Sequence, residues 1–402
     1  MIFNSLLIAN RGEIACRIIK TAKEMGIRSI AVYVDADRDA LFVNQADESI
    51  RLEDGGYLDG NQIIMAAKMS GAQAIHPGYG FLSENASFAR KVKKEKIIWV
   101  GPSPNVISVM GDKLKAKELA IQADVPTLPM TSKPNEAKQI GYPLLIKAAA
   151  GGGGKGMRIV TEEDDLNKAI NEAKIEAKKS FNDENVYLEK FLTSPKHIEI
   201  QVLCDSFGNV VTLGERDCSI QRKHQKLIEE SPSSVLTNEN REKISELCRK
   251  SMKEIGYEGV GTLEFLYENN EFYFMEMNTR LQVEHPGTEM VTGIDLVKEQ
   301  ILVANGEKLK INQEDIKLKG SSIECRINAE HPESFIPSPG KITQYHQPGG
   351  LGIRVDSAVY DGYSIPSHYD SMIGKLITYG ATRSEALKKM NRALEELSLI
   401  HI

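Results

Sequence analysis

The pattern of apolar and polar positions predicts alternating strands and helices in the N-terminal part of the chain. Residues 5–9 are apolar, as in a buried strand, and residues 13–25 carry apolar side chains at helical spacing before a capping Gly26. A second buried strand follows at residues 29–34. This order predicts a doubly wound, Rossmann-like sheet. The first turn contains only Gly12, which disfavours a nicotinamide dinucleotide site.

A loop rich in glycine and proline follows the next predicted strand. A helix at about residues 61–70 and a strand ending at Ile75 lead into residues 76–85, His-Pro-Gly-Tyr-Gly-Phe-Leu-Ser-Glu-Asn. Loops at the carboxyl ends of parallel strands usually carry function, although these residues fit a plain turn equally well. A further helix and a strand at residues 97–100 precede a predicted domain edge at residues 101–104.

The middle of the chain contains a second glycine-rich loop, set between two short strands. Strands are predicted at residues 144–147 and 158–160, with four consecutive glycines at 151–154 between them. No helix follows, which argues against a Rossmann loop, and Lys155 is followed by glycine, which excludes a Walker A motif. The backbone of such a loop can close on phosphates. We therefore expect a phosphate-covering lid rather than a flexible linker.

Two further stretches combine strand patterns with charged side chains. Residues 186–192 are predicted to form a strand entering a loop, where Glu189 could accept a proton from an adenine amino group. Residues 197–202 alternate polar and apolar positions, as a half-buried strand does. Between Glu215 and Glu230 the chain is dense in Arg, Lys, His and Gln. This stretch fits a basic solvated loop, and it fits a site for a triphosphate and an oxyanion equally well.

A hairpin is predicted from residues 262–266 and 272–277, with Asn269 and Asn270 at its turn. For Glu264 and Glu276 to lie opposite each other on one face, the hairpin needs a three-residue turn or a bulge. Glu264, Glu276 and Asn278 would then offer three oxygen ligands to Mg²⁺. The absence of sulfur and imidazole from this set argues against zinc.

In residues 276–285, Glu-Met-Asn-Thr-Arg-Leu-Gln-Val-Glu-His, every second position from Glu276 to Glu284 carries a polar side chain, and in a strand these side chains would share one face. A solvated charged edge strand would show the same alternation. The polar positions, however, carry carboxylates, amides and a guanidinium rather than Lys or Ser, and an aromatic strand precedes them. We expect an active-site strand that breaks into a loop after Asn278.

Composition narrows the class of protein. The chain has 402 residues, 41% of them hydrophobic and 26% charged, and a net charge of -6, so nucleic acid is not an expected partner. No apolar run is long enough to span a membrane. The five cysteines are scattered and contain no CxxC pair, which predicts a reducing, cytoplasmic location. Further strands are predicted at residues 322–330 and within 337–380, and a helix at 383–397.

Taken together, these motifs resemble those of the biotin carboxylase family, the ATP-grasp component of acetyl-CoA carboxylase and related biotin-dependent enzymes. The resemblance runs from Leu6 to about Leu397. It rests on six segments in the family's order: residues 9–15, 76–85, 151–154, 215–226, 276–285 and 324–330.

The resemblance implies a role for each matching residue. Glu284 would be the general base, and Arg326 would stabilise the biotin enolate next to Tyr79 in the biotin site. Bicarbonate would be bound by Lys226, Arg280, Gln282, Val283 and Glu284. The metal ligands would be Glu264, Glu276 and Asn278. ATP would be bound by Lys113, Lys147, Gly153, Gly154, Glu189, Lys190, Phe191, Leu192, His197, His224, Glu264 and Glu276.

The implied fold combines α/β and α+β parts. A Rossmann-like domain at residues 1–111 would precede an ATP-grasp domain at 112–320, with its lid at about 128–190, and a C-terminal biotin carboxylase domain at 321–402. The implied reaction is ATP-dependent carboxylation of carrier-bound biotin by bicarbonate, with two Mg²⁺ or Mn²⁺ ions. A biotin carboxyl carrier protein and a carboxyltransferase would be partners, and the full-length chain would form a homodimer.

Three alternatives stay open at this point. The chain could be the biotin carboxylase part of a propionyl-CoA or pyruvate carboxylase, another ATP-grasp ligase such as half of a carbamoyl-phosphate synthase, or a non-catalytic nucleotide-binding protein that regulates or assembles a carboxylase. Two departures from the family are visible: Gly287 replaces a branched apolar residue, and the family continues beyond Leu397, where this chain ends after Ser398–Ile402. We expect a C-terminally truncated or frame-shifted domain.

Overall fold

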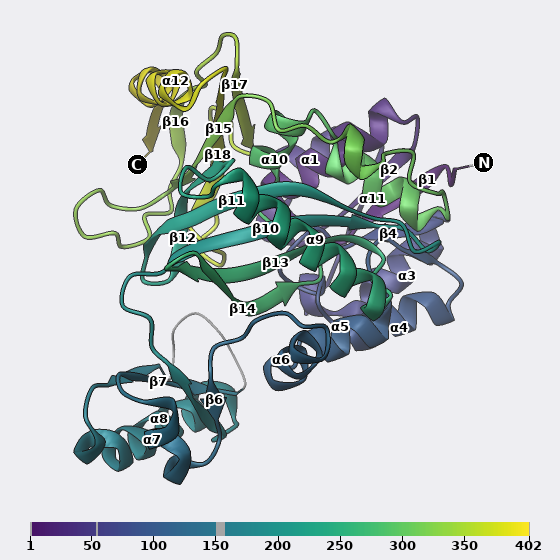
Figure 1. Cartoon of the computed structure of the whole chain (residues 1–402). Helices are drawn as coiled ribbons and strands as arrows, with labels where there is room; N and C mark the ends of the chain where they lie inside the picture. The colour runs from purple at the N-terminus through teal and green to yellow at the C-terminus, as the bar shows by residue number, and fades with distance from the viewer. Residues whose placement is uncertain (1, 54, 150–156, 402) are drawn as a thin grey trace.

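The N-terminal part of the chain forms a parallel sheet with helices packed on it (Figure 1). The computed structural model describes residues 2–53, 55–149 and 157–401. The strand order is β3-β2-β1-β4-β5, which confirms the predicted doubly wound arrangement. The strands are β1 (Ser5–Ile8), β2 (Arg28–Tyr33), β3 (Glu48–Arg51), β4 (Ala74–His76) and β5 (Ile98–Trp99). The helices are α1 (Gly12–Glu24), α2 (Leu41–Gln45), α3 (Gly60–Ser70), α4 (Ala86–Lys94) and α5 (Pro104–Met110).

A small lobe projects from the main body below helix α6 (Lys113–Gln122) in Figure 1. Its four-stranded sheet has the order β6-β9-β7-β8, and its own apolar core includes Leu144, Ile146 and Leu188. Its elements are β6 (Met130–Thr131), α7 (Ala137–Ile140), β7 (Leu144–Ala148), β8 (Arg158–Val160), α8 (Leu166–Phe181) and β9 (Val186–Lys190). The predicted lid glycines 151–154 lie outside the described residues, between β7 and β8.

An eight-stranded sheet forms the centre of the molecule, with the order β14-β13-β10-β11-β12-β15-β18-β17. It joins the two C-terminal parts predicted from the sequence, because β12 pairs antiparallel with β15 across residue 320. The strands are β10 (Lys196–Cys204), β11 (Val210–Arg222), β12 (Gln225–Ser231), β13 (Gly259–Glu268), β14 (Glu271–Asn278), β15 (Ser321–Asn328), β17 (Ile353–Ser357) and β18 (Met372–Gly380).

Four helices and a small ribbon complete the part of the chain that the structure describes. They are α9 (Asn238–Ile255), α10 (His285–Thr292), α11 (Leu296–Ala304), α12 (Arg383–Glu396), and the strands β16 (Ile342–His346) and β19 (Ser398–His401), which pair antiparallel. The mixture of a parallel α/β sheet with an antiparallel sheet confirms the predicted fold class.

The basic stretch at residues 215–230 is not a solvated loop. Most of it lies in β11 and β12, which form a hairpin whose turn is Lys223-His224, both with positive φ. Several of its side chains are buried, including Arg216 and Glu229. The sequence reading missed these strands because charged residues inside a sheet are uncommon unless they are paired.

The core beneath the central hairpin should be critical for stability. Phe265 is fully buried and packs edge-on against Phe272 and Phe274. Phe265→Ala should lower the free energy of unfolding by about 3–5 kcal/mol, because it removes an aromatic side chain and leaves a cavity. Urea denaturation of the whole chain measures this loss. Phe207→Ala is the matched control, since Phe207 is 62% exposed, and a comparable loss there would contradict the prediction.

Candidate active site

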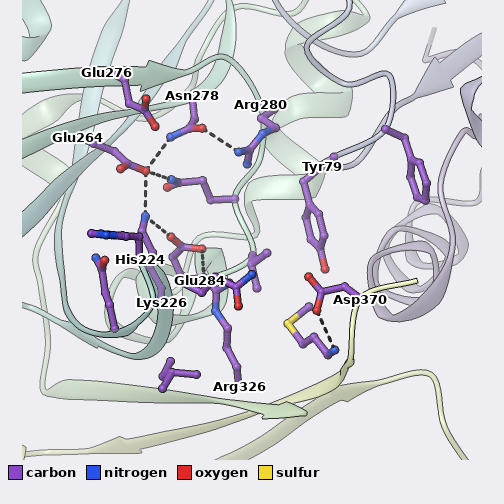
Figure 2. A pocket seen from close by; sticks show the side chains of 18 of the residues that line it. Tyr79, His224, Lys226, Glu264, Glu276, Asn278, Arg280, Glu284, Arg326 and Asp370 are labelled. Atoms are coloured by element: carbon purple, nitrogen blue, oxygen red, sulfur yellow. Dashed lines mark hydrogen bonds and ion pairs between the residues drawn. The ribbon is translucent and has the colours of Figure 1, made fainter. Parts of the chain in front are cut away.

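A cavity of about 840 Å³ lies between the N-terminal domain, the end of β7 and the central sheet. Figure 2 shows charged side chains from several elements pointing into it. It collects most of the residues that the sequence singled out: Tyr79, Lys113, Lys147, His197, His224, Lys226, Glu264, Glu276, Asn278, Arg280, Gln282, Val283, Glu284 and Arg326. Their proximity is an observation, whereas their individual roles remain predictions.

A bulge in the β13–β14 hairpin aligns the predicted metal ligands. Glu264 pairs with Glu276, but the next residue, Phe265, pairs with Phe274, so Met275 is the extra residue. The two-residue turn Asn269-Asn270 has left-handed backbone angles at both positions. The bulge, rather than a three-residue turn, therefore accounts for the facing carboxylates. As predicted, strand β14 ends at Asn278, and the chain continues as a loop to α10.

The ammonium of Lys226 is surrounded by three carboxylates. Its Nζ donates to Glu199 Oε2 at 2.5 Å, to Glu284 Oε1 at 2.7 Å and to Glu264 Oε1 at 2.9 Å. Burial alone would raise the pKa of Glu284, but Lys226 and Arg326 outweigh it and hold that pKa well below its usual range. Glu284 is therefore an ionised carboxylate inside the cavity, able to accept a proton.

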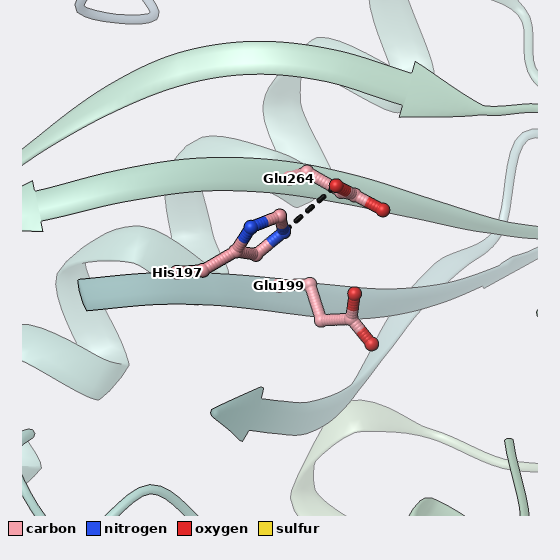
Figure 3. A group of neighbouring side chains, drawn as sticks. All are labelled: His197, Glu199 and Glu264. Carbon is pink, nitrogen blue, oxygen red and sulfur yellow. Dashed lines mark ion pairs between the residues drawn. The ribbon is translucent and has the colours of Figure 1, made fainter. Parts of the chain in front are cut away.

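Glu264 accepts three hydrogen bonds and lies next to one imidazole. Its Oε1 accepts hydrogen bonds from Lys226, from Asn278 Nδ2 at 2.7 Å and from Gln282 Nε2 at 2.7 Å. Its Oε2 lies 2.7 Å from His197 Nε2, as Figure 3 shows. Burial acts to lower the pKa of His197, but the Glu264 carboxylate overrides it, so that this pKa is raised. Lys226 and Gln282, two of the side chains expected to contact a bound anion, thus converge on one oxygen.

The two arginines predicted for the site lie on opposite sides of this cluster. Arg280 donates to Glu84 Oε2 at 2.8 Å and to Asn278 Oδ1 at 2.8 Å. Arg326 donates to Glu229 Oε1 at 2.7 Å and to Glu284 Oε2 at 3.1 Å. Both guanidiniums thus sit at the cavity wall in fixed orientations.

The nucleotide-side residues divide into two groups. Lys113 and Lys147 line the cavity, and Lys113 lies 3.5 Å from Glu276. Glu189 is 2% exposed and does not line it: one carboxylate oxygen accepts from Lys117 and the other from Lys147, at 2.6 Å. In this structure the Glu189 carboxylate, which was predicted to accept a hydrogen bond from adenine, therefore accepts from two lysines. Lys190, Phe191 and Leu192 do not line the cavity either, and Gly153 and Gly154 lie outside the described residues.

The sequence reading missed several buried partners of the site. Glu199 shares the strand parity of His197, so the alternation of β10 could have identified it. Arg216 lies in the charged stretch at residues 215–230, where nothing distinguished it from its neighbours, and Lys375 gave no local signal. Lys375, on β18, is fully buried and donates to the carbonyl of Val283 at 2.7 Å, and its Nζ lies 3.2 Å from Glu13. Glu13 also accepts from the hydroxyl of Tyr79.

Among the described residues, three sets of side chains could hold a metal ion. Glu264, Glu276 and Asn278 supply only hard oxygen ligands and line the cavity, which fits Mg²⁺ or Mn²⁺. His197, Glu199 and Glu264 also lie close enough to share an ion, and so do Glu199, Cys218 and Glu284. Glu199, however, already accepts from Arg216 and Lys226, so its negative charge is neutralised. The first set fits the ion better.

These features together define a nucleotide-dependent ligase site of the ATP-grasp class: a small strand-rich lobe, two lysines, and a carboxylate hairpin facing the buried carboxylate of Glu284. Family models match almost all of the chain. They are described as the biotin carboxylase N-terminal domain (residues 2–107), the carbamoyl-phosphate synthase L chain ATP-binding domain (112–312) and the biotin carboxylase C-terminal domain (324–401). The chain belongs to the biotin carboxylase family.

Individual relatives agree over nearly the full length. Biotin carboxylase of Haemophilus influenzae is 54% identical, over 97% of this chain and 90% of the relative. A pyruvate carboxylase subunit from Methanothermobacter thermautotrophicus is 52% identical, over 100% of this chain and 84% of the relative.

Solved structures resemble the whole chain as well. The biotin carboxylase–β,γ-ATP complex of Campylobacter jejuni has a TM-score of 0.96 and 51% identity, covering 100% of this chain and 92% of that one. The biotin carboxylase domain dimer of the 2-oxoglutarate carboxylase from Hydrogenobacter thermophilus, in complex with MgADP, ADP and bicarbonate, has a TM-score of 0.96 and 48% identity, covering 100% and 91%.

A pair of carboxyl groups lies behind the cavity wall. Glu229 and Glu324 are direct cross-strand partners, and both are buried. Neither oxygen of Glu324 has a hydrogen-bond partner among the residues that the structure describes. Burial raises the pKa of Glu324 well above its usual value, and the Glu229 and Glu284 carboxylates add to the shift against the opposing charge of Lys375. Its surroundings therefore favour the protonated form of Glu324.

This raised pKa predicts how stability depends on pH. A carboxyl whose pKa is raised on folding stabilises the chain fully below its unfolded pKa, and this contribution is lost as the pH rises. Glu324→Gln has no group that titrates at this position, so it should lose less stability than the wild type as the pH rises. The free energy of unfolding of the variant minus that of the wild type should increase by up to about 1.4 kcal/mol per pH unit above about pH 4.3. Urea denaturation between pH 4 and 8 measures this slope. Exposed Glu314→Gln should give a flat difference, and a flat difference for Glu324→Gln would refute the assignment.

Proposed function

We propose that this chain carboxylates biotin on a biotin carboxyl carrier protein, using ATP and bicarbonate, as the first half-reaction of a biotin-dependent carboxylase such as acetyl-CoA carboxylase. The observation that carries the proposal is the ionised Glu284 held between Lys226 and Arg326 in the same cavity as the Glu264–Glu276 pair. A base, cationic groups and oxygen ligands are the components that this reaction needs.

Bicarbonate is a poor nucleophile, and Glu284 would take its proton as the bicarbonate oxygen attacks the γ-phosphorus of ATP. Lys226, Arg280, Gln282 and the backbone of Val283 would bind the anion. The bond formed is oxygen to phosphorus and the bond broken releases ADP, which gives carboxyphosphate. This product hydrolyses readily, so a closing lobe over the site would exclude water.

Phosphoryl transfer depends on positioning and charge rather than on covalent help from the protein. Lys113, Lys147 and His197 would bind the phosphates, with His224 near the nucleotide. Glu264, Glu276 and Asn278 would hold two Mg²⁺ or Mn²⁺ ions, which neutralise charge on the transferring phosphoryl group when bound. Glu189 would hold the adenine, with Lys190, Phe191 and Leu192 beside it, once Lys147 turns from its carboxylate to the phosphates.

Carboxyphosphate then yields CO₂ and phosphate, and the phosphate can accept the ureido proton of biotin. Arg326 would stabilise the enolate that forms on the biotin ring, because a fixed guanidinium does not have to reorganise when the charge appears. Tyr79 would contribute to the biotin site.

Domain limits, partners and location complete the proposal. We assign residues 1–111, 112–320 and 321–402 to the three domains. The partners would be a biotin carboxyl carrier protein and a carboxyltransferase, and the chain would pair as a homodimer, as in the Hydrogenobacter structure. No helix among the described residues is long and apolar enough to cross a membrane. The five cysteines are unpaired and buried, which supports the reducing environment of the cytoplasm.

The deciding experiment is bicarbonate-dependent ATP hydrolysis with and without free biotin. Stimulation by biotin supports biotin carboxylation, whereas bicarbonate-dependent hydrolysis that biotin leaves unchanged would favour another ATP-grasp ligase. The relatives named pyruvate carboxylase and 2-oxoglutarate carboxylase share this half-reaction, so the acceptor of the second half must be assayed with the transferase itself.

Removing the base should stop turnover without releasing the nucleotide. Glu284→Gln retains the size of the side chain but cannot accept the bicarbonate proton, so kcat should fall about 10²–10⁴-fold. ATP affinity, measured by equilibrium binding, should change less than about twofold. This is under half of the roughly 1.4 kcal/mol of binding free energy that corresponds to a tenfold change. Exposed Glu271→Gln serves as the control. Retained turnover in Glu284→Gln would rule out its role as the base.

The metal assignment makes a separate prediction. Glu276→Gln removes one charged ligand, and the Mg²⁺ concentration for half-maximal activity should rise about tenfold or more, since a charged contact contributes about 1.5–3 kcal/mol. Binding of Mn²⁺ in the presence of ADP, followed by electron paramagnetic resonance, should weaken in parallel. An unchanged metal requirement would place the ion at the His197–Glu199–Glu264 set instead.

A further inference from the structure

Arg216 stands directly behind the proposed bicarbonate site. It lies on β11, its side chain is 1% exposed, and it does not line the cavity. A guanidinium buried this completely must satisfy its donors within the protein, because an unpaired buried charge is very costly. Its partners therefore show what it holds in place.

All five N–H donors of Arg216 have an acceptor. An arginine has five such donors and no acceptor. Nε donates to Glu199 at 2.5 Å, Nη1 to Gln201 at 2.8 Å and to Thr288 at 2.7 Å, and Nη2 to Gln282 at 2.7 Å. The fifth contact, from Nη2 to Thr262, is longer at 3.4 Å. Contacts to five different side chains thus fix the orientation of the planar guanidinium.

The contact with Gln282 settles which way its amide faces. Because a guanidinium only donates, the oxygen of the amide must point to Arg216. The NH₂ group is thereby turned away from Arg216, toward Glu264 Oε1 at 2.7 Å. Gln282 and Glu264 both line the cavity, so the donor end of Gln282 lies at the cavity wall.

The contact with Glu199 connects Arg216 to Lys226, the second side chain proposed to bind the anion. Glu199 accepts from Arg216 through Oε1 and from Lys226 through Oε2, at 2.5 Å each. The same guanidinium therefore stands behind Gln282 directly and behind Lys226 through one carboxylate. Both side chains line the cavity and depend on this one support.

We propose that Arg216 is a positioning residue that sets the polarity of the bicarbonate site, by fixing Gln282 with its NH₂ group toward the anion and Lys226 beside it. The proposal rests on the proposed function for the identity of the anion. A lysine cannot replace Arg216, because three donors on a flexible stem do not form the planar fork.

The first test is Arg216→Lys. The KM for bicarbonate should rise about tenfold or more, the effect of weakening one or two charged hydrogen bonds, while the KM for ATP stays within about twofold. A purely structural defect would change both constants together. Arg17→Lys is the matched control: Arg17 is also buried and paired with Glu289 and Asp295, yet does not line the cavity, and both constants should stay near those of the wild type.

A second test leaves Arg216 intact, in case its replacement prevents folding. With Arg216 fixing one oxygen, Gln282→Glu places the other, negatively charged oxygen in the anion site. Its KM for bicarbonate should therefore exceed that of Gln282→Ala. If the KM for bicarbonate of Gln282→Glu is equal to or lower than that of Gln282→Ala, the side chain at position 282 is free to turn away and the proposal fails. If Arg216→Lys folds, adding it to Gln282→Ala should raise the bicarbonate KM less than it does in the wild type, and full additivity would also overturn the proposal.

Binding is measured separately from turnover, so that the proposal does not depend on the reaction. Bicarbonate is titrated against the thermal unfolding midpoint with MgADP present, and the apparent affinities of the variants should follow the same order. A wild type that binds bicarbonate but shows no biotin-stimulated hydrolysis would refute the proposed function alone. Equal bicarbonate affinity in the wild type and Arg216→Lys would refute the role of Arg216 alone.

Discussion

The ammonium of Lys226 is the interaction on which the site depends. Glu199, Glu264 and Glu284 come from β10, β13 and the loop after β14, and all three are buried within reach of this one nitrogen. Three carboxylates at such spacing would repel each other and take up protons. A lysine has three donors, one for each, so Lys226 holds the three carboxylates together. The central sheet can therefore carry the ionised carboxylate of Glu284 inside the protein.

Much of this arrangement could be predicted from local sequence. The parity of residues 276–284, the break after Asn278 and the need for an irregularity opposite Glu264 follow from strand geometry, and the structure has all three. The parallel order of the N-terminal strands follows from the strand–helix–strand pattern. These features are set by residues close together in the chain.

The remainder depends on contacts between distant segments. Arg216 meets Gln282, 66 residues further on, and nothing near either position signals the contact. Glu189 was predicted from its strand-end position, but its neighbours Lys117 and Lys147 come from α6 and β7. The hairpin at residues 215–230 was obscured for the same reason, since its charged residues are buried only because partners on other strands neutralise them.

The contact made by Lys375 determines when the loop that carries Glu284 can be fixed in place during synthesis of the chain. Lys375 donates to the carbonyl of Val283, next to Glu284, and it comes 92 residues later in the chain. Because synthesis runs from the N-terminus, the nucleotide-side elements leave the ribosome well before this clamp exists. The loop that carries Glu284 can therefore reach its observed conformation only after strand β18 has been made and has paired with β15 in the central sheet.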